Sequence, residues 1–421
     1  GFNYLGRFSG GTGRDWEPLA DIGALREGVD PANPAVALEI NALAQDGPDG
    51  TRLDIALAWP AGILAGADVA ELASLWAQAL TALSRCPDLA GHTPSDFPLV
   101  AAAQSDVADW ERRGDVEDAL PLLPLQEGMY FHSAYGGGVD TYRVQQVAEL
   151  TGHLDPDALR TAVSAVVRRH QALRAGFREL ADGRLAQVIW TDAEPEFHVV
   201  ESSDARAADA LAAEQLSRPF DLADPPLLRY VLTSLAPDRH RLIQTMHHIV
   251  ADGWSYPLVF GEVVAEYNAA VGAGRAPEPP AATLRDHAEA IRAVDHDAAR
   301  AAWAEQLTGV SPTLVVDDTA PVGEHVSVVR HLSEELTRAL IGTARDRGVT
   351  PSTVLHGAWG LVLGGLLDRA DVVFGSTVSG RGGRLAGTEG IVGLLINTIP
   401  VPMSWTPGAS LGAVMSDLQD R

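Results

Sequence analysis

Cysteine and long apolar runs are both scarce in this sequence, and each absence excludes a class of protein. Cys86 is the single cysteine among 421 residues, which excludes an intrachain disulfide framework and a cysteine-rich metal site. No run of about 18 apolar residues occurs, and the opening GFNYLGRFSGG lacks the basic region and apolar core of a signal peptide. We therefore expect a cytoplasmic protein that does not enter the membrane.

Positive charge is scarce as well. The 31 Lys and Arg residues against 56 Asp and Glu give a formal net charge of −25, which repels nucleic acid and anionic membrane. The 13 histidines do not cluster at metal-ligand spacing, and no G-x-S-x-G element of a serine hydrolase is present. Gly10–Gly13 and Arg381–Arg384 are rich in glycine but match no phosphate-binding loop, and we interpret both as turns. We therefore expect neither a nucleic-acid partner nor a metal.

Strand-like and helix-like segments alternate along most of the chain. With 46% hydrophobic residues, the chain can bury two or three cores, and the missing initial Met indicates a piece of a longer polypeptide. Residue periodicity predicts strands at 51–59, 142–150, 183–190, 227–232, 240–246 and 370–378, and helices at 66–84, 157–173, 256–271, 295–307, 333–347 and 352–367. This order predicts an α/β sandwich.

Two adjacent histidines stand at the end of a predicted strand, in the stretch MHHIVADGWS. Successive strand residues point to opposite faces, so one histidine can face a cleft while the other packs. Asp252 follows His248 by four positions and can brace the loop through a buried ion pair. The alternative is a pair of core histidines beside a solvated turn. For two adjacent histidines without further motif residues, this structural interpretation is the more common one.

This stretch resembles the HHxxxDG motif of nonribosomal peptide synthetase condensation domains, in the chloramphenicol-acetyltransferase-like superfamily. Four further segments resemble motifs of that family in the same order: Leu120–Ser133 with Gln126, Arg169–Phe177 with Arg174, TLRDHAEAI around Ala288, and Val378–Val401 with Asn397. The resemblance implies two α/β sandwich lobes that form a V around a central tunnel. We expect the N-lobe at 119–290 and the C-lobe at 291–421, the latter ending before the family's final part.

The opening residues resemble a second family. FNYLG, Trp16, Pro18 and the later HTPSDFPLV are similar to the C-terminal tail of an epimerization domain and its exit linker. An ordinary edge strand is the alternative for FNYLG alone. We expect such a tail at 1–92 and an interdomain linker at 93–118, which is polar and turn-prone and then weakly helical. One hypothesis is that residues 1–92 complete the C-lobe in a permuted manner.

The resemblance also implies a reaction and roles for named residues. The amine of a carrier-bound L-aminoacyl acceptor attacks a carrier-bound peptidyl thioester, which ends in a D-residue if an epimerization domain precedes. Both substrates hang on 4'-phosphopantetheine arms, so no cofactor is bound directly, and the partners are donor and acceptor carrier proteins and adjacent adenylation domains. The implied roles are an amine base or amine-orienting group at His248, a supporting residue at His247, an oxyanion-stabilising N–H near Gly253, a brace of Asp252 paired with Arg174, and tunnel or motif positions at Trp254, Ser255, Gln126 and Asn397.

Two other functions remain open. An epimerase of the same superfamily needs a proton-shuttling carboxylate opposite the histidine. A catalytically silent module keeps the fold and recruits carrier proteins or an oxygenase, and the intact histidine loop argues against it.

Overall fold

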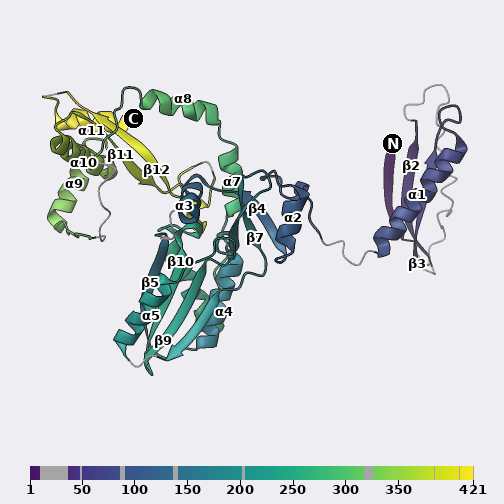
Figure 1. Ribbon diagram of the computed structural model, residues 1–421, viewed down its shortest axis with the longest axis horizontal. Helices are drawn as coiled ribbons and strands as arrows, with labels where there is room; N and C mark the ends of the chain where they lie inside the picture. The colour runs from purple at the N-terminus through teal and green to yellow at the C-terminus, as the bar shows by residue number, and fades with distance from the viewer. Residues whose placement is uncertain are drawn as a thin grey trace. The chain divides into compact units, whose positions relative to one another are not determined.

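The chain folds into two compact units, Gly1–Gly91 and His92–Arg421. The computed structural model describes residues 1–9, 37–47, 50–85, 91–135, 141–201, 204–316, 326–383, 385–406 and 408–420 (Figure 1). Trp16, Pro18, Cys86, Gly10–Gly13 and Arg384 lie outside these residues. Within the described residues, no helix combines the length and the apolar character needed to span a bilayer.

The first unit is a three-stranded sheet with one helix. Its strands follow the order β1 (Phe2–Ser9), β2 (Glu39–Gly47) and β3 (Gly50–Ala58), with β1 and β2 parallel and β2 and β3 antiparallel. Helix α1 (Gly66–Arg85) places Trp76 edge-on against Phe2, with ring centroids 5.9 Å apart. The predictions of a strand at FNYLG, a strand at 51–59 and a helix at 66–84 are confirmed.

The second unit contains a four-stranded sheet in the order β5 (Arg143–Thr151), β10 (Arg239–His247), β9 (Leu228–Ala236) and β8 (Glu196–Glu201). Strands β8 and β9 are parallel, and the other pairs are antiparallel. Leu242 and Met246 pack with helices α4 (Pro156–Arg169) and α6 (Ser255–Ala270), whereas Ile243 packs with helix α5 (Ala205–Ser217). Because the side chains of β10 alternate, its two faces are covered by different helices.

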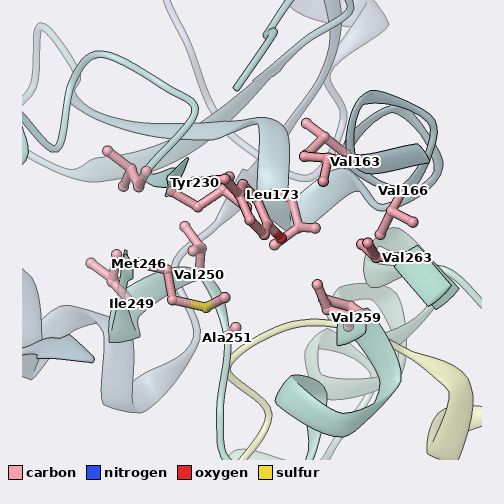
Figure 2. Close-up of a cluster of buried hydrophobic side chains, with 14 of the residues drawn as sticks. Val163, Val166, Leu173, Tyr230, Met246, Ile249, Val250, Ala251, Val259 and Val263 are labelled. Atoms are coloured by element: carbon pink, nitrogen blue, oxygen red, sulfur yellow. The ribbon is translucent and has the colours of Figure 1, made fainter. Parts of the chain in front are cut away.

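One apolar core holds the histidine loop in place. Figure 2 shows part of this core, in which α4, α6 and β10 meet the loop residues Ile249, Val250 and Ala251. All three loop side chains are buried. Burying an aliphatic side chain stabilises the fold by about 1.5–3 kcal/mol, so the segment between His248 and Asp252 is anchored by its own apolar residues.

Residues 93–118 are not a linker, contrary to our prediction. They form η2 (Pro94–Asp96), helix α2 (Gln104–Glu111) and the start of β4 (Val116–Pro121), which pairs with β7 (Leu185–Trp190) beside β6 (Ala175–Glu179). Phe97 and Trp110 lie edge to face and are buried in one core with Trp190. These apolar residues are few and are separated by polar ones, so the local composition concealed a segment that tertiary packing buries.

The remaining elements complete the second unit. They are α3 (Pro124–Tyr135), η3 (Gln171–Arg174), η4 (His248–Val250), α7 (Leu284–Arg292), α8 (His296–Gln306), α9 (Glu334–Asp346), α10 (Pro351–Leu367), β11 (Asp371–Val378), η5 (Thr388–Gly390), β12 (Asn397–Ser404) and α11 (Leu411–Asp420). Strands β11 and β12 pair antiparallel (Figure 1). The lobe boundary that we expect after residue 290 falls inside α7. Residues 391–396 form no strand, and the N–H groups of Leu395 and Ile396 reach Asp252 in the histidine loop.

Candidate active site

The two histidines differ in burial and in hydrogen bonding. His247 ends β10 with no exposed surface, its backbone N–H donates to the Leu227 carbonyl at 2.9 Å, and its Nδ1 accepts the Ile249 N–H at 3.1 Å. A nitrogen that accepts a backbone N–H is unprotonated, so this bond fixes both the tautomer and the orientation of the ring. His247 is thus held inside the fold through both its backbone and its ring.

His248 is partly exposed. Its backbone N–H donates to the Tyr142 carbonyl at 2.7 Å, and its ring lies edge-on to Tyr256 with centroids 6.0 Å apart. Its Nδ1 is buried and has no hydrogen-bond partner among the described residues. An incoming group therefore reaches this ring through Nε2.

Asp252 forms a buried ion pair with Arg381. Nη1 of Arg381 lies 2.7 Å from Oδ2 of Asp252, and Nη2 lies 3.0 Å from Oδ1. Oδ2 also accepts the backbone N–H groups of Leu395 and Ile396 at 3.0 and 3.2 Å. Oδ1 accepts the Ser255 N–H at 2.9 Å. The carboxylate thus connects the histidine loop to the segment that precedes β12.

The surroundings of Asp252 keep it charged. Burial acts to raise the pKa of Asp252, but the Arg381 guanidinium and the hydrogen bonds from Ser255 outweigh burial and hold this pKa below its usual value. A carboxylate that is ionised and saturated with donors is a poor proton acceptor at neutral pH. These contacts favour a bracing position for Asp252 over that of a base.

The prediction that Arg174 pairs with Asp252 is wrong. Arg174 is buried, its Nη1 lies 2.6 Å from Oε2 of Glu117, and its guanidinium donates to the carbonyls of Trp190 and Val167 at 2.9 and 3.2 Å. Arg174 thus joins η3 to β4, β7 and α4. None of these elements is the histidine loop. Its spacing in the sequence could not reveal which carboxylate it meets, because that choice depends on long-range packing.

Arg381 is the functional residue that the sequence reasoning missed. We interpreted the glycine-rich stretch around it as a turn, and its neighbour Gly380 does have a positive φ of 65°. A Cβ at Gly380 would lie 1.8 Å from the Leu395 carbonyl oxygen, so glycine is required for this close approach. The sequence did contain one indication of this role, which is the arginine directly after a glycine. A tight turn at such a glycine can direct a long side chain into the fold.

The structure brings three of the other expected residues to the loop. The buried Ser255 hydroxyl lies within hydrogen-bond distance of both Asp252 and the Gly393 carbonyl, at 2.8 and 2.9 Å. Trp254 is 51% exposed, lies 5.8 Å from the Arg381 guanidinium carbon and donates its indole N–H to the Glu389 carbonyl at 3.2 Å. Gln126 is buried and donates to the Ile249 carbonyl at 3.0 Å.

Gly253 and Asn397 stand apart from this hydrogen-bonded network. Gly253 is exposed, and a Cβ there would meet nothing within 4 Å. Its φ is not positive, so neither strain nor crowding within the described residues requires a glycine. Asn397 begins β12, and its Oδ1 accepts the neighbouring Thr398 N–H at 2.8 Å.

The described part of the chain contains no group of three or more His, Cys, Asp and Glu side chains arranged to hold a metal ion.

The fold and the histidine loop define an α/β protein of the chloramphenicol-acetyltransferase type, in which a partly exposed histidine follows an interior strand of a mixed sheet. The family model described as Condensation domain matches residues 116–421. The chain therefore belongs to the condensation-domain family, the acyltransferases that form amide bonds in nonribosomal peptide synthesis.

Several relatives are large synthases. A subunit of the linear gramicidin synthase of Brevibacillus parabrevis is 34% identical over 352 residues, which cover 80% of this chain and 4% of the relative. Vanchrobactin synthetase of Vibrio anguillarum is 30% identical and covers 97% of this chain and 15% of the relative. The chain thus spans a small fraction of the length of the curated relatives it matches.

Solved structures share the fold. The X-domain in a teicoplanin-biosynthesis complex with OxyB is 25% identical, with a TM-score of 0.62 over 71% of this chain and 68% of that one. The condensation domain of the monacolin K polyketide synthase is 21% identical, with a TM-score of 0.60 over 73% and 72% of the two chains.

Proposed function

We propose that the unit His92–Arg421 catalyses attack of a carrier-bound L-aminoacyl amine on a carrier-bound peptidyl thioester. The partly exposed His248, held beside a buried Asp252–Arg381 pair, carries this proposal. The attacking nitrogen loses a proton as the amide bond forms, and the thiol of the donor phosphopantetheine arm leaves. Tethering both substrates supplies much of the rate through proximity.

His248 has the position to assist that attack. A neutral imidazole near pH 7 can accept the proton of the amine through Nε2 or hold the amine by a hydrogen bond. Gly253 supports a second role for this loop: its N–H makes no hydrogen bond within the described residues, and a Cβ built there would meet nothing within 4 Å. A free backbone N–H in such a place can stabilise the oxyanion that develops on the thioester carbonyl.

The first unit supports a D-configured donor. We propose that Gly1–Gly91 is the final part of an epimerization-type domain, which makes the donor peptide end in a D-residue. The match to vanchrobactin synthetase covers 97% of the chain and so includes most of this unit. Carrier proteins and adenylation domains of one synthetase are the partners that this arrangement implies.

A condensation assay tests the proposal. The chain is mixed with a donor carrier loaded with a peptidyl thioester and an acceptor carrier loaded with an L-aminoacyl group, and the new amide is followed by mass spectrometry. We expect the D-ended donor to react faster than its L-ended epimer, and His248→Ala to lower the rate by about 100-fold or more. A His248→Ala chain that condenses as fast as the unchanged chain contradicts the role of His248.

Two alternatives have distinct outcomes in the same assay. Inversion of the donor α-carbon without amide formation, seen by chiral analysis of the released peptide, identifies an epimerase. The fold likeness to an X-domain solved with OxyB favours a silent recruitment module as the second candidate. Carrier binding without any product identifies that module.

A further inference from the structure

The side-chain amide of Gln126 connects the start of helix α3 to the carbonyl of Ile249, the residue that follows His248. Gln126 is 1% exposed. Its Oε1 accepts the Leu123 N–H at 2.8 Å, and its Nε2 donates to the Ile249 carbonyl at 3.0 Å. Because α3 begins at Pro124, Gln126 is its third residue and makes the reach-back bond of a capping box. The same amide thus caps a helix and holds the histidine loop, 123 residues further along the chain.

Backbone groups determine the orientation of this amide. An N–H can meet only an acceptor and a carbonyl only a donor, so Leu123 and Ile249 leave one arrangement of oxygen and nitrogen. Gln187, which is fully buried on β7, places its Oε1 3.4 Å from Nε2 of Gln126. The Nε2 of Gln187 donates to the Pro121 carbonyl at 2.8 Å. Two buried amides therefore join α3, β4, β7 and the histidine loop.

We propose that Gln126 is a positioning residue for His248, and that Gln187 holds the side-chain amide of Gln126 in its orientation. The proposal rests on the condensation function given above. The Tyr142 carbonyl restrains the backbone before the His248 ring through the His248 N–H. Gln126 restrains the carbonyl of Ile249, the residue directly after His248. Without that bond the Ile249–Val250 peptide can rotate and shift the backbone beside His248. A displacement of the imidazole by about 1 Å can lower the rate by up to about 100-fold.

Substitutions at Gln126 can separate positioning from stability. Gln126→Met keeps the length of the side chain and removes both bonds, whereas Gln126→Glu keeps the acceptor for Leu123 and removes the donor to Ile249. Gln145→Met is the matched control, because the Gln145 amide donates to the Ala212 carbonyl and to Thr245 Oγ1 at 2.8 and 2.9 Å, on the side of the sheet covered by α5. If Gln126→Met does not fold, Gln187→Met tests the same connection from its outer partner.

Two measurements on the whole chain decide the matter: condensation kinetics with loaded carriers, and the ¹⁵N NMR signals of the His248 ring. We expect both Gln126 variants to lower the rate at saturating acceptor by about 10-fold or more, with little change in KM and with shifted His248 signals. Gln145→Met should change neither.

Gln126 and Gln187 variants with a rate within about twofold of the unchanged chain and unmoved His248 signals overturn the proposal, even if they melt earlier. If the unchanged chain forms no amide, the condensation function fails instead, and the His248 signals still report whether Gln126 positions the ring.

Discussion

Arg381 and Asp252, which are 129 residues apart in the sequence, form a two-point ion pair that is closed off from solvent. The pair ties the histidine loop to the loop after β11. Both charged side chains are buried, so each depends on the other and on the hydrogen bonds around them. The geometry at His248 therefore depends on a segment from the C-terminal part of the chain.

Removal of one member of this pair should destabilise the chain strongly. Asp252→Leu leaves a buried guanidinium and Arg381→Met leaves a buried carboxylate, and either change is expected to cost about 3–5 kcal/mol. The double variant has no buried charge and should be more stable than either single variant. Urea unfolding of the three variants measures this, and a double variant that loses the sum of the two single effects contradicts it.

Stability should fall in mild acid because of His287 on α7. Burial and the positive charge of Arg381 lower the pKa of His287. Between that lowered pKa and the unfolded value of about 6.5, the unfolded chain binds a proton that the folded chain does not, so stability is lost as pH falls through this window. His287→Phe should weaken this dependence in urea unfolding from about pH 7.5 to 5. A His287→Phe chain with the same pH dependence as the unchanged chain contradicts this explanation.

Two glycines should respond to alanine in opposite ways. Gly380→Ala places a Cβ 1.8 Å from the Leu395 carbonyl oxygen at a φ of 65°, so folded protein should be lost. Gly253→Ala meets open space, so its free energy of unfolding should change by no more than about 0.5 kcal/mol. The added methyl group should still lower kcat/KM, because it occupies space that we assign to the thioester. A Gly253→Ala chain with unchanged kcat/KM shows that the thioester does not approach there.

Arg174 should be coupled to Glu117 and independent of Asp252. Residues that touch show a coupling free energy of about 0.5–3 kcal/mol, whereas distant sites are additive within about 0.5 kcal/mol. We expect coupling in the cycle of Arg174→Ala with Glu117→Ala, whose side chains are 2.6 Å apart. The cycle of Arg174→Ala with Asp252→Asn should be additive. Urea unfolding of the single and double variants provides both values, and coupling in the second cycle would restore the pairing that the structure contradicts.

The sequence by itself determined most strands and helices and the different positions of the two histidines. Periodicity is local, so HRLIQTM predicted the strand β10, and alternation at its end predicted that one histidine packs while the other can face a cleft. The resemblance to condensation domains gave the catalytic role to His248 and the supporting role to His247. The order of five motifs indicated the family in the same way. Each strand, helix and motif is recognised from residues that are near one another in the chain.

Only the tertiary structure decided which residues meet across the fold. Asp252 pairs with Arg381 and not with Arg174, and Gln126 reaches Ile249. Residues 93–118 are not a linker, because Phe97, Trp110 and other apolar side chains of that segment are buried in a core. Spacing in the sequence carries no distance between such segments. The packing of α3, the loop after β11 and the segment before β12 around one apolar core decides which partner each buried polar group finds.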